Sequence, residues 1–286
     1  METVDYVNEL PPPSRLGLLD GFLQEEKLGS PVDMYQRSVG DILRYGTQER
    51  LRESDFLGRL LVIGIVSAAE AYFRGVLSSC MEICPIAQSV SAKRTINLGG
   101  LLWHGQTGFS RSAFEHASFS SKDELTKMCR DYLDINLDNQ NFKDLLDQFE
   151  RVCQLLHGIV HGDGLLPGRN AVQLDIKRYK KPVRIVARYE QLQAIAAVVN
   201  TLIMTLNRHL FLEICKRWAI DWRKRADWDP ANENSTFSAI WAIFYCGEEA
   251  RRRKGRSRMT RACRQLPPSP WRPVSRCGES RLQHAE

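Results

Sequence analysis

Two histidines four residues apart stand near an arginine in the stretch RVCQLLHGIVHGDG, which runs from Arg151 to Gly164. On a helix His157 and His161 would share one face, because residues four apart lie about one turn apart. Such a pair of imidazoles can bind a metal ion, transfer protons in RNA cleavage, or close the end of a helix. Each role needs different neighbours, so the rest of the chain has to decide among them.

A metal site at this pair lacks ligands. Two imidazoles supply only half of a tetrahedral zinc site. Gly158 stands where a zinc protease of the HExxH type has its glutamate, and the sequence contains no CxxC motif. Cys80 and Cys84 have helical spacing, but nothing in the sequence brings them to the histidines. We therefore expect no metal and no other cofactor.

The structural alternative is that the histidines close a helix. Positive charge is favoured near a helix C-terminus, and Gly162 suits the position after the last helical residue. This interpretation explains one histidine better than it explains a cluster of four polar residues at the end of an amphipathic helix. The four are Arg151, His157, His161 and Asp163. The interpretation stays open at this point.

The histidine stretch also resembles the HEPN superfamily, including its RiboL-PSP-HEPN type. The resemblance rests on HGIVHGDG at the end of a helix and on VSAAEAYFRGVL in a buried helix upstream, and it covers roughly residues 55 to 215. The superfamily consists of α-helical domains, many of them metal-independent endoribonucleases in toxin–antitoxin and antiphage systems. Its signature is an arginine followed, after four to six residues, by a histidine.

The resemblance leaves two registers open. Aligning HGIVHGDG places the family histidine at His161 and the family arginine at Leu156. The other register pairs Arg151 with His157, which have five residues between them. The histidine is therefore assigned more clearly than the arginine.

Metal-free RNA cleavage needs proton transfer at the 2′-hydroxyl and the leaving group, together with a fixed positive charge on the phosphate. The resemblance implies His161 as the proton-transfer residue and Arg151 as the phosphate-binding candidate, with His157 beside it. Asp163 and Glu70 are then the orienting groups. Arg169, just after the glycines, is another source of positive charge.

Glu70 stands in a helix that is apolar on nearly all sides. A buried carboxylate without a partner is costly, so we expect Glu70 to hydrogen-bond His161 or an arginine of the motif. The alternative is an exposed carboxylate at the surface.

The resemblance implies a HEPN-like metal-independent endoribonuclease of the toxin or defence type, weakened by leucine at the expected arginine position. The alternative is an inactive HEPN-like module for dimerisation or partner binding. The expected partners are an RNA substrate, a second copy of the chain, and an antitoxin or another protein, with no membrane.

The elements that position these residues read as helices. Apolar spacing and capping residues predict helices over about 31–50, 54–84, from 121, 142–161 with Asn141 as its cap, and 189–218. Residues 86–120 read as short helix and loop, and β-branched runs around Lys180, Lys181 and Pro182 predict a hairpin. The expected fold is all-α, a HEPN-like helical bundle over residues 30–220 with a small β-hairpin insert. An N-terminal extension (1–29) and a C-terminal extension (221–250) flank it.

The net charge of +6 is concentrated in the last residues. Residues 251–286 contain 11 Lys or Arg and two Glu, so the remainder of the chain is mildly acidic. This segment is rich in Arg, Pro and Ser and has no apolar period, which predicts a disordered basic tail. The tail either binds nucleic acid or was never selected to fold.

The eight cysteines are scattered, which is typical of reduced thiols in a cytoplasm. The first residues, METVDYVNELPPP, lack the basic start and apolar centre of a signal peptide. The longest apolar run, residues 60–69, is shorter than the roughly 20 residues that span a bilayer. These features predict a soluble cytoplasmic protein.

Overall fold

The computed structural model describes residues 14–26, 29–95, 98–105, 108–177, 179–247 and 250. Within these residues the chain is built from helices, and one isolated antiparallel bridge joins Leu165 and Arg184. The helices are η1 (Leu19–Phe22), α2 (Pro31–Tyr45), α3 (Gln48–Glu53), α4 (Asp55–Ile83), α5 (Pro85–Ser91), α6 (Leu98–His104), α7 (Phe109–Ser112), α8 (Lys122–Leu133), α9 (Gln140–His161), α10 (Gly168–Gln173), α11 (Tyr189–Ile220), η2 (Trp222–Lys224), η3 (Pro230–Asn232) and α12 (Glu233–Phe244). The prediction of an all-α fold is confirmed.

Several helix starts follow from local capping. Ser30, Ser54 and Ser121 each accept a hydrogen bond from the backbone N–H three residues further on, at 3.2 Å. This satisfies a donor that the first turn of a helix leaves free. The helix expected to run from 31 to about 50 is instead two helices, because α2 ends at Gly46 and Thr47 caps α3.

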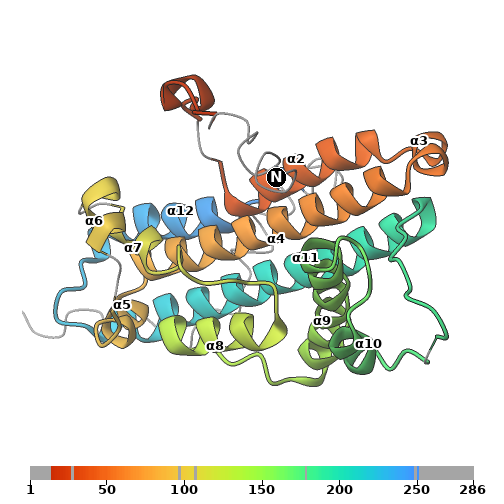
Figure 1. Cartoon of the computed structure of the whole chain (residues 1–286). Helices are drawn as coiled ribbons and strands as arrows, with labels where there is room; N and C mark the ends of the chain where they lie inside the picture. Colours follow the sequence, from red (N-terminus) through yellow and green to blue (C-terminus); the bar gives the residue numbers. More distant parts are fainter. Residues whose placement is uncertain are drawn as a thin grey trace, which may run out of the picture.

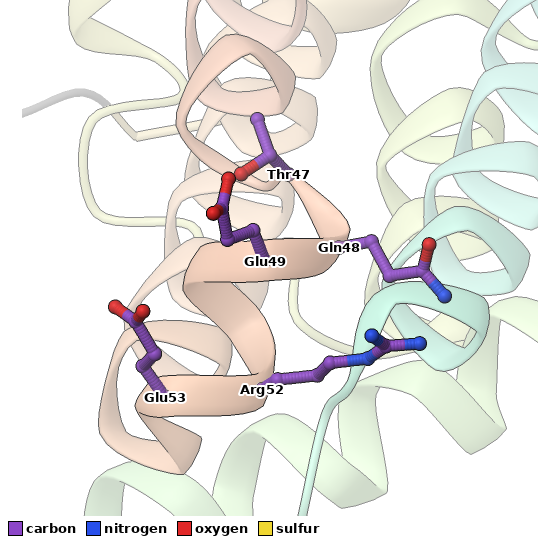
Figure 2. Close-up of a pocket in the computed structure, with 5 residues that line it drawn as sticks. All are labelled: Thr47, Gln48, Glu49, Arg52 and Glu53. Atoms are coloured by element: carbon purple, nitrogen blue, oxygen red, sulfur yellow. The ribbon is translucent and has the colours of Figure 1, made fainter.

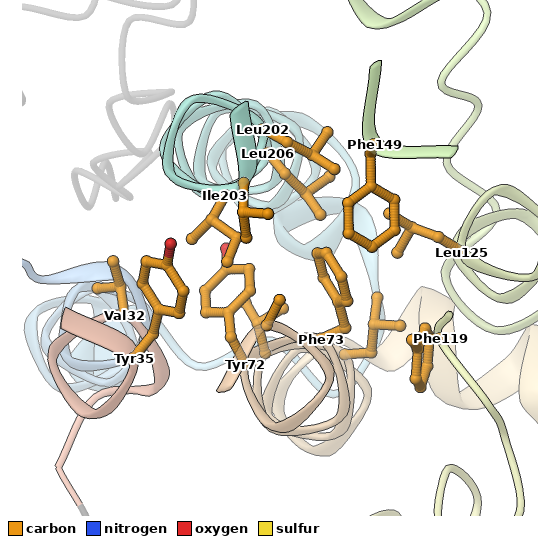
Figure 3. Close-up of a cluster of buried hydrophobic side chains, with 14 of the residues drawn as sticks. Val32, Tyr35, Tyr72, Phe73, Phe119, Leu125, Phe149, Leu202, Ile203 and Leu206 are labelled. Carbon is orange, nitrogen blue, oxygen red and sulfur yellow. The ribbon is translucent and has the colours of Figure 1, made fainter. Parts of the chain in front are cut away.

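The core is built around α4 (Figure 3). Tyr72 and Phe73, in the middle of this helix, are almost completely buried. The Tyr72 ring lies 6.2 Å from the Tyr35 ring of α2, and the Phe73 ring lies 5.8 Å from both Phe119 and Phe149 of α9. Leucine and isoleucine side chains of α11 close the cluster from the other side (Figure 3). Tyr72 and Phe73 thus connect α4 to three other helices, which are α2, α9 and α11.

Residues after 220 also belong to this core. Ile240, Ile243 and Phe244 of α12 are buried in the same cluster, and α12 packs against α4 and α11. Asn207 of α11 reinforces the contact, since its amide donates to the Phe244 carbonyl oxygen at 2.9 Å. The domain boundary expected at residue 220 therefore falls between α12 and the helices against which α12 packs, α4 and α11.

The expected hairpin is absent from the described part of residues 171–188. Its first run contains the end of α10, and its second run lies extended beside residues 164–166. Leu166 N–H donates to the Val183 carbonyl at 2.9 Å, and Ile185 N–H donates to the Gly164 carbonyl at 2.7 Å. The β-branched run therefore pairs with the turn after α9 rather than with its neighbour in sequence.

Two helices, α4 and the stretch from Tyr189 to Lys224, are long and apolar enough to cross a membrane by length and composition. About half of the most apolar window is buried against other parts of the structure in each case, 50% and 44%. The buried core helices of soluble proteins have the same length and composition, so these properties are weak evidence for a membrane span. The predicted cytoplasmic location stays a prediction.

The expectation of a disordered basic tail concerns residues 251–286, which lie outside the described part of the chain. The same holds for residues 1–13 of the expected N-terminal extension.

Candidate functional site

The candidate site lies at the C-terminal end of α9, which crosses the α4 and α11 helices (Figure 1). Asn139, rather than the expected Asn141, caps this helix. The side chain of Glu150 accepts the Lys122 N–H at the start of α8 at 3.0 Å, and Gln154 accepts from buried Asn170 of α10 at 2.6 Å. These bonds fix α9 between two neighbours.

The two histidines extend from the last turns of α9 to the surface. His161 is exposed and His157 is partly buried. Their rings stack, with centroids 6.0 Å apart and planes 19° apart. Neither side chain makes a hydrogen bond or ion pair within the described residues. The imidazoles therefore do not satisfy the carbonyl groups at the end of the helix and are free to meet a ligand.

The two candidate arginine positions differ in environment. Leu156 is 9% exposed and belongs to the core cluster. Arg151 is exposed, and it forms no ion pair in the part of the chain that the structure describes. In an α-helix Arg151 stands about 120° around the axis and about 9 Å along it from His157, and about 15 Å along it from His161. Within one chain α9 therefore does not bring Arg151 beside either imidazole.

Glu70 is partly buried and paired, but its partner is not the one expected. Its carboxylate accepts a hydrogen bond from Arg74, one turn later in α4, at 3.0 Å. Arg74 also donates to the Ala117 carbonyl at 2.9 Å and lies over the Phe119 ring. The expected hydrogen bond to His161 or to an arginine of the motif is not formed, so Glu70 and Arg74 link α4 to the loop before α8.

The turn after α9 is formed by residues 162–164, which we call the glycine turn. The helix ends at His161 as predicted, but the left-handed residues are Asp163 (φ 51°) and Gly164 (φ 79°) rather than Gly162. Gly164 N–H donates to the carbonyls of Gly158 and Ile159, both at 3.2 Å. The turn thus satisfies the last carbonyls of α9 and directs the chain back toward α4.

Two arginines that the sequence did not single out meet at the glycine turn. Arg184 donates to the Asp163 carbonyl, and its guanidinium lies 3.5 Å from the Asp163 carboxylate. Arg59 of α4 lies at the same point, since a Cβ atom added to Gly164 would stand 3.0 Å from Arg59 Nε and 3.1 Å from Arg184 Nη1. No sequence signal links these residues, because they come from three distant parts of the chain.

Two hollows on the surface do not include the histidines. One hollow is formed by α3 and the residue before it (Figure 2), and is lined by Thr47, Gln48, Glu49, Arg52 and Glu53. A second lies over α8 and the start of α9, and its polar lining includes Lys122, Asp123, Lys143 and Asp147. Among the described residues no group of three or more His, Cys, Asp and Glu side chains is placed to hold a metal ion.

Searches of protein-family models, of curated proteins and of solved structures find no match to this chain. The residues at the end of α9 therefore have to be interpreted by their own geometry and chemistry.

Proposed function

We propose that the chain is a metal-independent endoribonuclease that uses His161 for proton transfer. The observation that supports this best is the pair of stacked, accessible imidazoles, which have no hydrogen-bond partner in the described part of the chain. A side chain left free at the surface end of a tightly packed helix is available for a substrate. Imidazole is also the side chain best suited to proton transfer near neutral pH.

In the proposed reaction the RNA 2′-oxygen attacks the adjacent phosphorus, and the bond from phosphorus to the 5′-oxygen breaks. One imidazole takes the proton of the 2′-hydroxyl, and the other gives a proton to the leaving 5′-oxygen. The products are a 2′,3′-cyclic phosphate and a 5′-hydroxyl. His157 and His161, with ring centroids 6.0 Å apart, supply two such groups.

The developing charge on the phosphate requires a cation. Arg151 serves in this proposal from a second copy, across a homodimer, since it lies about 15 Å along α9 from His161 of its own chain. Arg59 and Arg184 at the glycine turn are the nearer cations in the same chain. An antitoxin or another protein would bind over this exposed end of α9 in a toxin or defence system.

The test is cleavage of a fluorescently labelled single-stranded RNA, measured with and without EDTA. His161→Ala should lower the rate by about 10²- to 10⁴-fold, as expected for loss of a general acid or base. His116→Ala is the matched control, because His116 is exposed elsewhere on the surface and should keep the natural rate. Cleavage that persists in His161→Ala, or that stops when EDTA is added, would exclude the proposed mechanism.

The second candidate function is an inactive module for dimerisation or partner binding. It is favoured by Val160, which is 50% exposed between the two histidines, and by the core position of Leu156. Sedimentation of the natural protein and of Val160→Lys tests this function. A dimer that dissociates in Val160→Lys, together with no cleavage of any RNA by the natural protein, would favour the module.

A further inference from the structure

Arg59 and Arg184 bring two positive charges to one point of the surface. Both side chains lie about 3 Å from the position that a Cβ atom on Gly164 would occupy. Their backbones are held together independently, because the Cβ-free Gly58 of α4 packs directly against Ala187. Two guanidinium groups so close repel each other unless a negative group lies between or beside them.

The neighbouring groups offset this charge only in part. Arg59 Nη1 is completely buried and has no hydrogen-bond partner among the described residues. The Arg59 guanidinium lies 5.9 Å from the centre of the Phe56 ring, whose side chain is largely exposed. The Asp163 carboxylate is 3.5 Å from Arg184, but it is 96% exposed and therefore well screened by water. A buried guanidinium N–H without an acceptor is costly.

We infer that Arg59 and Arg184 form a binding site for a phosphate group. Phosphate oxygens accept several hydrogen bonds, and guanidinium groups match them with two parallel N–H donors each. A bound phosphate would accept hydrogen bonds from the exposed Arg184 guanidinium and relieve the repulsion between the two arginines.

The site lies next to the proposed catalytic residue. Asp163, which Arg184 contacts, is two residues after His161, so their Cα atoms are at most about 8 Å apart. A phosphate of an RNA strand held by the two arginines would bring a neighbouring linkage to the imidazole. This assignment to RNA rests on the proposed function, whereas the binding of phosphate does not.

The first experiment measures thermal unfolding of the full chain with inorganic phosphate or with chloride at equal ionic strength. Phosphate should raise the Tm of the natural protein, because a ligand that binds the native state stabilises it. In chloride, Arg59→Gln should raise the Tm by about 2 to 4 °C, since it removes a repelling charge. Arg184→Gln should change the Tm less, because it also removes the contacts to Asp163. Both variants should lose the increase caused by phosphate.

Two further variants make the result specific. Arg111→Gln removes an exposed arginine of α7 at the other end of the molecule and should keep the phosphate response (Figure 1). Asp163→Asn removes the carboxylate that competes for Arg184, and asparagine tolerates the left-handed backbone, so its phosphate affinity should rise severalfold. If Arg59→Gln does not fold, Arg184→Gln still decides, because its side chain is 44% exposed.

The second experiment measures binding of a labelled single-stranded RNA to the His161→Ala protein. Adding Arg184→Gln should weaken binding about tenfold and lower the salt dependence by about one ion. A phosphate response without this effect on RNA would overturn the RNA assignment and keep the phosphate site. No phosphate response in the natural protein, or an equal one in both arginine variants, would overturn the inference itself.

Discussion

Leu156 shows that the identity of one residue has to be read together with its burial. By sequence it stands where the HEPN-like register would have an arginine, which suggests that an arginine there would restore a missing charge. In the structure Leu156 packs into the core. The side chain at this position packs α9 against the core. In the proposed reaction, the positive charge that binds the phosphate therefore has to come from another residue.

Leu156→Arg is therefore expected to destabilise the protein rather than to activate it. Burying a guanidinium without a partner is costly, and Leu156→Ala alone should cost about 2 to 4 kcal/mol of unfolding free energy. Urea unfolding of both variants measures this, and Arg should be at least as destabilising as Ala. A Leu156→Arg protein that is as stable as the natural one and cleaves RNA about a hundredfold faster would show that the HEPN-like register is catalytic after all.

The ion pair between Glu70 and Arg74 should contribute little to stability. Both side chains are partly accessible, and pairs one helical turn apart in such positions are worth about 0.5 kcal/mol. A double-mutant cycle with Glu70→Ala and Arg74→Ala measures the coupling directly. Arg74→Ala alone should cost more than Glu70→Ala, because it also removes the bond to the Ala117 carbonyl. A larger effect of Glu70→Ala would point to a contact beyond this pair.

At the scale of elements, the approach of α4 to residues 183–187 sets the position of the arginine pair. A Cβ atom on Gly58 would stand 1.9 Å from the Ala187 carbonyl oxygen, a distance that no side chain can accept. The backbone of residues 183–187 would have to move away. Arg184 would then move with it.

Gly58→Ala should lower the unfolding free energy by about 2 kcal/mol or more and should also remove the phosphate response. Gly40→Ala is the matched control, because Gly40 lies in α2 with nothing within 4 Å of its added Cβ. Alanine there should raise stability by up to about 1 kcal/mol, since it favours the helix. Thermal unfolding of both variants, with and without phosphate, gives the comparison. Equal stability of the two variants would mean that the backbone of residues 183–187 can move away from α4 without lowering the unfolding free energy.

Local signals explain which elements could be predicted. Ser54 and Ser121 cap helices through bonds to residues three positions away, so a short window of sequence contains the whole cause. The β-branched run at 183–186 pairs with residues 164–166, and this depends on how α9 is placed. The meeting of Arg59 with Arg184 depends on the same tertiary arrangement. The histidines were found because both stand on one helix, whereas the arginines were missed because three segments bring them together.

At the scale of the whole molecule, His209 makes stability depend on pH. Burial lowers the pKa of His209 from its usual 6.5, with Glu213 opposing this effect and Lys216 adding to it. The unfolded chain therefore takes up this proton before the folded one does. The contribution of His209 is fully present above about pH 6.5 and is lost as the pH falls below it.

His209→Gln should consequently lose less unfolding free energy than the natural protein between pH 7.5 and pH 5.5. Urea unfolding at the two pH values checks this, with His116→Gln as the control for an exposed histidine. The control should lose as much stability as the natural protein. If His209→Gln loses as much as well, His209 does not contribute to the acid sensitivity.

The start of α2 is tied to the far end of the described chain. Ser30 Oγ donates to the Tyr245 carbonyl at 2.6 Å, and Asp33 accepts from Gly247 N–H at 2.8 Å. During synthesis on a ribosome, these two bonds can form only after nearly every later helix has been made, although the cap bond from Asp33 N–H to Ser30 is local. Contacts so distant in sequence form late, so the N-terminal end of α2 would be fixed to the rest of the structure only when translation of the described chain is nearly complete.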